Sequence, residues 1–273
     1  MPSFVPQSMN KILLFILLAL SSSFRVLATE AVAENSIRTS NSPENRVVLL
    51  ELYTSEGCSS CPPADQFLSS LKSAGVSTEK LIPVAFHVTY WDYIGWQDRF
   101  ANPQFDKRQR ELARKNQLST IYTPQFVLSG VDYRAYATFG EDVNRLASEK
   151  ATVEISLSAD TTCASNDAEI MHLKLSADIS KTEVEGVGFY LVVTEDNLTS
   201  DVDDGENEGR KLHHDSVVRQ FLGPYYPSKQ GGLFRREQAI TLQPDWKRED
   251  LSVIAFAENP QTGEVLQAVS LKY

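Results

Sequence analysis

The sequence predicts an α/β N-terminal domain followed by an all-β, sandwich-like C-terminal domain. Residues 46–150 alternate apolar runs with amphipathic segments, which is the pattern of strands interleaved with helices. Residues 151–273 instead repeat a polar–apolar alternation that is typical of half-buried strands separated by turns. With 42% hydrophobic and 23% charged residues, the composition is that of a folded protein rather than a disordered one.

The overall charge excludes two classes of partner. The chain has 273 residues and a formal net charge of −10. Nucleic-acid binding needs a basic surface that displaces phosphate counterions, and docking on anionic lipid needs one too. We therefore expect no nucleic-acid partner and no attachment to a membrane surface.

The N-terminus is predicted to be a signal peptide over residues 1–28. Lys11 precedes an uninterrupted apolar run at 12–20, and small residues at 26–28 suit cleavage after Ala28. The apolar run is too short to span a membrane. Residues 29–45 are polar and are expected to form a flexible leader. The mature protein should therefore be exported, to the periplasm or outside the cell, and free of the membrane after cleavage.

The N-terminal domain, residues 46–150, is expected to begin with a buried strand. The run at 47–53 is mostly apolar, as in strands covered on both faces. A helix follows, with Ala64, Phe67, Leu68 and Leu71 at helical spacing. Asn102 before Pro103 is typical of the start of a second helix. We expect strands at 47–53, 81–88, 125–128 and 131–136, and helices at 64–74, 105–116 and 140–149.

The C-terminal domain, residues 151–273, is expected to consist of strands. Charged residues at 201–210 predict an exposed loop, and the His213–Asp215 run is interpreted as a surface hairpin. Six segments have period-2 alternation: 152–157, 169–179, 187–194, 239–242, 252–257 and 265–271.

Two cysteines carry the clearest chemical signal. Cys58 and Cys61 form a Cys-x-x-Cys motif directly after a predicted strand and at the start of a predicted helix. The helix N-terminus stabilises a thiolate at the first cysteine, and the second lies close enough to resolve a mixed disulfide. Two thiolates are too few for a closed zinc site. Cys163 is left over, which suggests a buried thiol or an intermolecular pair.

Thr123 and Pro124 form the second element of the predicted site. They precede a predicted strand, and a cis proline there would present a backbone edge to an extended substrate beside the dithiol. We therefore assign Thr123 and Pro124 to substrate presentation, next to Cys58 and Cys61.

The chain resembles the thioredoxin superfamily and, more narrowly, a family of exported thioredoxin-like proteins described as a domain of unknown function. The resemblance runs from about residue 46 to the end and includes a Cys-x-Ser-Cys-Pro-Pro-Ala-Asp motif. It rests on residues 51–65 (ELYTSEGCSSCPPAD), 86–92 (FHVTYWD), 95–96 (GW), 122–125 (YTPQ), 205–214 (GENEGRKLHH) and 217–219 (VVR).

This resemblance implies a thioredoxin-like fold for residues 46–150, with further site residues. Glu51 is the nearest match to the buried acid of thioredoxins, offset by one residue, and is a candidate proton acceptor. His87 is a candidate acid–base group, although a lone histidine in a strand is more often simply packed. Gly57, rather than an aromatic residue, precedes Cys58, so the redox potential of a thioredoxin does not carry over.

An aromatic segment is a candidate substrate groove. Tyr90, Trp91, Asp92 and Trp96 lie between the predicted strand at 81–88 and the predicted helix at 105–116. Packed core aromatics with an aspartate cap are an equally good interpretation of this segment.

Taken together, the motifs predict an exported thiol–disulfide oxidoreductase that acts on protein thiols or disulfides, or on a redox partner. Cys58 would attack, Cys61 would resolve, and no cofactor is required because the dithiol carries the electrons. Two alternatives remain. One is a non-catalytic binding or assembly module with a structural disulfide. The other is a copper carrier that uses Cys58, Cys61 and His87.

Overall fold

Two parallel strands form the central pair of the main sheet. The computed structural model describes residues 1–3, 37–164, 168–228 and 231–273. In the parallel pair of β2 (Val48–Thr54) and β3 (Leu81–His87), Val48 lies opposite Leu81 and Thr54 opposite His87. Every residue of β2 is buried, because side chains cover both of its faces. The predicted strands at 47–53 and 81–88 are confirmed.

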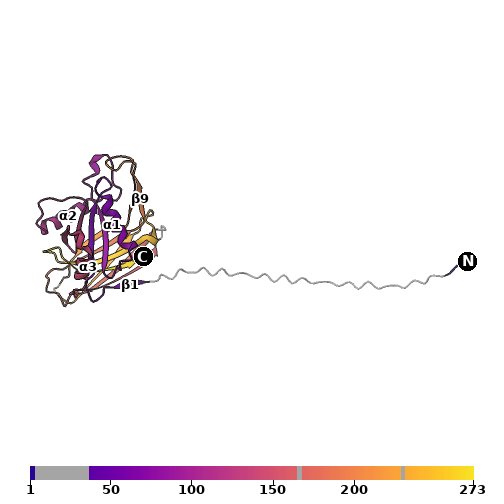
Figure 1. Ribbon diagram of the computed structural model, residues 1–273. Helices are drawn as coiled ribbons and strands as arrows, with labels where there is room; N and C mark the ends of the chain where they lie inside the picture. The colour runs from indigo at the N-terminus through magenta and orange to yellow at the C-terminus, as the bar shows by residue number, and fades with distance from the viewer. Residues whose placement is uncertain (4–36, 165–167, 229–230) are drawn as a thin grey trace. The chain divides into compact units, whose positions relative to one another are not determined.

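The other elements predicted before residue 150 also form, with shifts of a few residues. β4 (Gln125–Leu128) pairs antiparallel with β2 and with β5 (Val131–Tyr133). The Asn102 side chain accepts a hydrogen bond from the Gln104 N–H at the start of α2, as expected of a helix cap. The helices are α1 (Pro62–Ser73), α2 (Pro103–Lys115) and α3 (Phe139–Ala147), with short 3-10 turns at Asp92–Ile94, Tyr136–Thr138 and Arg248–Asp250 (Figure 1).

The helices divide between the two faces of the sheet. Val48, Leu50 and Leu52 of β2 pack against buried residues of α1 and α3. Alternate residues of the same strand, including Leu49 and Tyr53, pack against Phe105 and Leu112 of α2. Successive side chains of β2 therefore contact different helices, because α1 and α2 pack on opposite faces of this strand.

The expected fold class, an α/β thioredoxin-like N-terminal domain followed by an all-β sandwich-like domain, is wrong. The protein is mostly β, and the described residues contain no α/β thioredoxin-like N-terminal domain. One eight-stranded sheet, in the order β14-β13-β8-β11-β3-β2-β4-β5, joins strands from both halves of the chain. The late strands are β8 (Gly188–Glu195), β11 (Val217–Tyr225), β13 (Leu251–Glu258) and β14 (Val265–Lys272).

The fold differs from the expected one because a strand from the second half of the chain pairs with the edge of β3. β11 pairs with it in parallel, with Val217 opposite Ala85, and continues antiparallel into β8. Hydrophobic periodicity identifies strands but does not say which strands pair, so the junction is invisible in the sequence. The described residues from 37 onward consequently form one compact unit.

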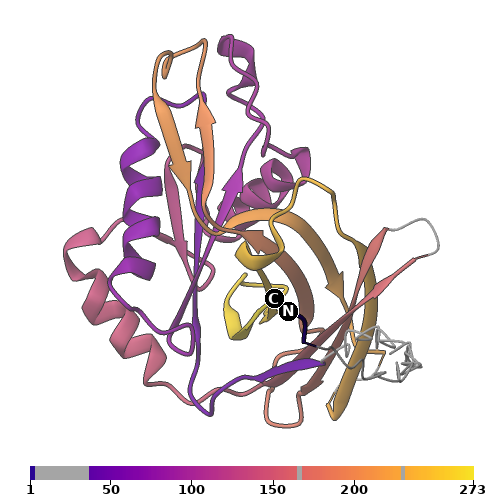
Figure 2. The ribbon, with the colours of Figure 1, turned by 90° about the vertical axis from the view of Figure 1, so that its right-hand side faces the viewer.

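A second sheet covers part of the first. Its order is β1-β6-β7-β12, from β1 (Arg38–Asn41), β6 (Glu154–Cys163), β7 (Glu169–Asp178) and β12 (Leu233–Thr241). Its apolar face packs on β8, β13 and β14 through one shared core cluster, which includes Leu157, Leu173 and Val253. Figure 2 shows the ribbon from the side that faces right in Figure 1. β1 lies within residues 29–45, where the sequence predicts a leader, and it pairs with β6 from Arg38 opposite Ala159 to Asn41 opposite Ser156.

A two-stranded hairpin lies alongside α1. β9 (Leu198–Asp201) and β10 (Lys211–His214) pair antiparallel, and Figure 2 shows the hairpin in orange next to the helix. The segment predicted as an exposed charged loop forms its tip. This hairpin brings residues from beyond position 200 to the cysteine motif.

The predicted signal peptide lies almost entirely outside the described residues, which omit 4–36. Among the helices that the structure describes, none has the length and apolar character needed to cross a bilayer.

Candidate functional site

A disulfide joins Cys58 and Cys61 between the end of β2 and the start of α1. Their Cα atoms are 5.4 Å apart, and Cys61 is the N-cap residue of the helix. The Cys61 carbonyl accepts hydrogen bonds from the N–H groups of Ala64 and Asp65. Pro62 and Pro63 occupy the first turn, where N–H groups have no partner within the helix. The predicted pair therefore exists and is oxidised in this structure.

The two sulfur-bearing residues are almost fully covered. Cys58 is 1% exposed and Cys61 is 0% exposed, whereas the intervening Ser59 and Ser60 are exposed. The Cys58 N–H donates to the Ser55 carbonyl at 3.1 Å, which tightens the loop that follows β2. A thiol partner can reach the sulfurs only when this loop moves.

The tip of the β9–β10 hairpin holds the cysteine loop closed. The Asn207 Nδ2 group donates to the carbonyl oxygens of Glu56 at 2.7 Å and Cys58 at 3.0 Å. The Glu206 carboxylate accepts a hydrogen bond from the Ser59 N–H at 3.0 Å. Both residues lie in the 205–214 segment that carries the family resemblance, but sequence reasoning missed their role because this charged loop has no period and reaches the motif only through the fold.

We expect Asn207→Ala to loosen this loop. The change removes two hydrogen bonds from a side chain that is 1% exposed. It should lower the free energy of unfolding by about 1–3 kcal/mol and speed reduction of the disulfide by dithiothreitol. Urea unfolding and thiol trapping over time measure the two effects.

Glu208→Ala is the matched control, because the Glu208 side chain makes no hydrogen bond to the cysteine loop among the described residues. Equal reduction rates in the two variants would show that Asn207 does not restrain the loop.

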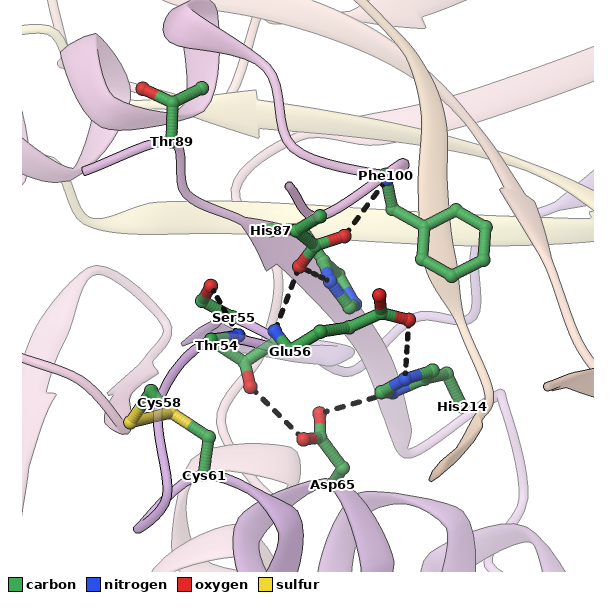
Figure 3. A network of polar contacts seen from close by, with 12 residues as sticks. Thr54, Ser55, Glu56, Cys58, Cys61, Asp65, His87, Thr89, Phe100 and His214 are labelled. Atoms are coloured by element: carbon green, nitrogen blue, oxygen red, sulfur yellow. Dashed lines mark hydrogen bonds and ion pairs between the residues drawn. A yellow bond between two sulfur atoms is a disulfide. The ribbon is translucent and has the colours of Figure 1, made fainter. Parts of the chain in front are cut away.

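A buried His–carboxylate cluster lies next to the disulfide. It consists of Glu56, Asp65, His87, Asp98 and His214, and Figure 3 shows four of these labelled around the end of β3. His87 Nδ1 lies 2.7 Å from Asp98 Oδ2. His214 Nε2 lies 3.3 Å from Glu56 Oε1, and His214 Nδ1 lies 3.8 Å from Asp65 Oδ1.

Further hydrogen bonds orient the carboxylates of this cluster. The Thr54 hydroxyl donates to Asp65 Oδ2 at 3.0 Å, and the Trp96 indole N–H donates to Glu56 Oε2 at 2.8 Å. Asp98 accepts hydrogen bonds from the backbone N–H groups of Glu56 and Phe100, both at 2.9 Å. Each carboxylate is therefore fixed by at least one neighbour.

The carboxylates around His214 favour the protonated, positively charged form of its ring. Burial lowers the pKa of His214, but close contacts with the carboxylates of Asp65 and Glu56 outweigh burial and raise that pKa to about 10. His214 thus carries one positive charge between two buried carboxylates at neutral pH.

The predicted residue Glu51 lies away from the disulfide. It faces α2, where Arg108 donates to both carboxylate oxygens at 2.7 Å, and it accepts a hydrogen bond from the Tyr53 hydroxyl at 2.8 Å. Glu258 is the second partner of Arg108, at 3.1 Å. The structure therefore places Glu51 in a buried ion-pair network on the face of the sheet opposite α1.

Thr123 and Pro124 lie at the same end of the sheet as the cysteine loop. Gln125 pairs with Tyr53, so the two residues before it adjoin the end of β2. The peptide bond between them is cis. The Trp91 indole N–H donates to the Thr123 hydroxyl at 2.7 Å, and a side chain at Gly57 would meet Trp91 at 3.2 Å. Trp91 thus links Thr123 to the cysteine loop.

The other predicted groove residues have different hydrogen-bond partners. The Tyr90 hydroxyl donates to Gln109 Oε1 at 3.1 Å, Asp92 accepts from the Asp98 N–H at 3.3 Å, and Trp96 turns toward Glu56. All four predicted residues are half-buried.

The predicted copper set is not assembled as a group. His87 groups with Asp65 and His214 as possible metal ligands, without Cys58 or Cys61, whose sulfurs are bonded to each other. Cys163 is a free, exposed cysteine at the end of β6, contrary to the buried thiol that was one of two expectations.

Sequence reasoning missed the roles of Glu56, Asp65, Asp98 and His214. Glu56, Asp65 and His214 lie within segments that carry the family resemblance, and His214 also lies in the run interpreted as a surface hairpin. The adjacent His213 is indeed exposed, with 51% side-chain exposure, whereas His214 has 2%. Alternation along β10 was the signal that separates them.

Fold and site together define a mostly β protein with a short-range disulfide at a helix N-terminus, beside a buried His–carboxylate cluster. The chain belongs to the family described as protein of unknown function (DUF1223), whose sequence pattern matches residues 49–258. Membership of a domain-of-unknown-function family is thereby confirmed. A comparison with curated proteins finds no match.

Two solved structures have a similar fold. The crystal structure of protein AGR_C_4864 from Agrobacterium tumefaciens has 21% identity and a TM-score of 0.54, covering 84% of this chain and 96% of that one. The structure of HBP35 of Porphyromonas gingivalis has 15% identity and a TM-score of 0.64, covering 85% of this chain and 76% of that one. At these identities the likeness concerns the fold alone.

Proposed function

We propose that the protein is an exported thiol–disulfide oxidoreductase that acts on protein thiols through Cys58 and Cys61. The observation that carries this proposal is a disulfide spanning three positions at the N-terminus of α1. The helix dipole and the unpaired N–H groups at that end favour a thiolate. The signal-peptide pattern supports export to an oxidising compartment, where such chemistry operates.

The short spacing favours exchange over stabilisation. In the chain-entropy description, closing a four-residue loop contributes only about 2 kcal/mol, against about 3 kcal/mol for a 15-residue loop. The same spacing keeps the second sulfur next to the first, which is what resolution of a mixed disulfide needs.

The exchange balances without a cofactor. In the reduced protein, the Cys58 thiolate attacks a substrate disulfide, forms a mixed disulfide and releases one substrate thiolate. Cys61, once deprotonated, attacks Cys58 Sγ, which releases the second substrate thiolate and forms the Cys58–Cys61 disulfide seen here. Two electrons pass to the substrate; the reverse sequence oxidises a substrate dithiol.

Near-complete burial of both cysteines favours the second candidate, a structural disulfide in a binding or assembly module. A protein thiol must first displace the exposed Ser59–Ser60 segment and the Asn207 contacts. The two candidates therefore differ in how readily the folded protein exchanges its disulfide.

Thiol trapping in glutathione buffers separates them. A reduction potential of about −120 to −270 mV in the folded protein supports exchange chemistry. A potential below about −300 mV, or a disulfide that resists reduction until the protein unfolds, contradicts the proposal and supports the structural role.

Variants extend this test. Cys58→Ser should abolish exchange with a disulfide substrate, and Cys61→Ser should accumulate a mixed disulfide. Cys163→Ser is the matched control, because that cysteine is free and lies on β6. Full activity of the Cys58 variant would refute the assignment.

A further inference from the structure

His87 presents a buried nitrogen that has no hydrogen-bond partner. The side chain is 0% exposed, and its Nδ1 is engaged by Asp98 at 2.7 Å. Its Nε2 is buried and unpartnered. Leaving a buried polar atom unsatisfied costs free energy, so such an atom in a folded protein calls for a ligand.

Two more side chains, those of Asp65 and His214, lie next to the His87 ring. The ligand atoms of Asp65, His87 and His214 all lie within 4.8 Å of one another, and all three residues are buried. The two ring nitrogens of His214 face Glu56 Oε1 at 3.3 Å and Asp65 Oδ1 at 3.8 Å, without the geometry of a hydrogen bond. Figure 3 shows His214 between Glu56 and Asp65.

Within the described residues, no lysine or arginine side chain pairs with the carboxylates of the cluster. Glu56, Asp65 and Asp98 are buried carboxylates. Within the described part of the chain, their ion-pair partners are His87 and His214. Three buried carboxylates and two imidazoles are a favourable setting for a divalent cation.

We propose that Asp65, His87 and His214 form a binding site for a divalent transition-metal ion of the zinc class, with Glu56 or water as a fourth ligand. Imidazole nitrogens with a carboxylate oxygen are typical zinc ligands and are poorly suited to Mg²⁺ or Ca²⁺.

The hydrogen bonds around the ligands have the pattern of a metal site. Asp98 accepts from the His87 ring, which fixes the tautomer that leaves a lone pair on Nε2. Thr54 holds Asp65 Oδ2, so that Oδ1 faces His214. Ligand atoms about 2.1 Å from a shared zinc ion lie at most about 4.2 Å apart, and the three candidate atoms already lie within 4.8 Å of one another.

A groove leads from the surface to the site. It has a volume of about 380 Å³, lies between α1 and β10, and is lined by Asp65 and His214 among others. Its remaining wall includes Ser69 and Lys211. An ion therefore has a path to two of the three ligands.

Zinc titration of the metal-free, full-length chain tests the proposal, with a chromophoric chelator as competitor. We expect one zinc ion per chain. His87→Gln and His214→Gln should each weaken binding by at least about 100-fold. His213→Gln is the matched control and should bind as before, because His213 is half-exposed on the same strand. The double variant Cys58→Ser/Cys61→Ser should also retain zinc.

A measurement on the unaltered protein guards against misfolded variants. The zinc K-edge X-ray absorption of the loaded protein should show only nitrogen and oxygen scatterers, and the Tm should rise by about 5 °C at a free zinc concentration near 100 times Kd. Absence of stoichiometric zinc, sulfur in the first coordination shell, or loss of zinc in the His213 variant would each overturn the site. The cysteine variant is expected to bind zinc whatever its exchange activity, so failure of the redox proposal and failure of this one are separable.

Discussion

Replacing Arg108 by methionine should lower the free energy of unfolding by about 3–5 kcal/mol. Arg108 is 5% exposed and pairs with Glu51 and Glu258, which are 0% and 1% exposed. The rings of Tyr190, Phe221 and Phe256 lie 5.1 to 5.2 Å from its guanidinium carbon. Methionine fills much of the space but leaves two buried carboxylates without their shared cation.

Urea unfolding followed by circular dichroism measures this effect. Lys107→Met is the matched control, because its side chain is 78% exposed and its ion pair with Glu111 is a surface pair at 4.0 Å. The control should change the free energy of unfolding by less than about 0.5 kcal/mol. If both variants were equally stable, the Glu51–Arg108–Glu258 network would not be a main source of stability.

Gly130→Ala should destabilise the protein by about 3 kcal/mol or more. Gly130 follows Ser129 in the two-residue turn between β4 and β5 and has a φ of +93°. A Cβ atom there would overlap the Gly263 carbonyl oxygen and lie 2.5 Å from the Gly263 carbonyl carbon. The alanine therefore forces apart two backbones that meet in the folded chain.

Gly140→Ala is the same chemical change with the opposite expected sign. Gly140 lies in α3, has helical backbone angles, and has nothing within 4 Å of an added Cβ. Alanine there should raise the free energy of unfolding by about 0.5 kcal/mol. Thermal and urea unfolding of both variants test the pair. A common direction of change would contradict the role assigned to the Gly130–Gly263 contact.

Local elements were predictable because their signals are local. The apolar run of β2, the helical spacing in α1 and the Asn102 cap all arise from residues close together in the chain. The pairing of β11 with β3 was not predictable, because the residues around Val217 and Ala85 contain no local signal that these two strands pair. That single pairing overturned the expected division into an α/β and a β part.

The residues of the candidate site were likewise predictable only where their signal is local in the sequence. Cys58, Cys61 and Thr123 were recognised from motifs, and the fold brings them to one end of the sheet. Asn207 and His214 were not recognised, because a hairpin about 150 residues later in the chain carries them to the motif. Glu51 was a candidate proton acceptor by resemblance to thioredoxins, and strand alternation turns it toward Arg108.

The position of β11 has a consequence for synthesis of the chain. β3 lies between β2 and β11, so one hydrogen-bonding edge of β3 stays open until residues 217–225 have been made. An unpaired apolar strand edge invites association with other chains. A nascent chain stopped before residue 217 should therefore aggregate or bind chaperones. The Cys58–Cys61 disulfide needs only neighbouring residues, so it is able to form while the sheet is still incomplete.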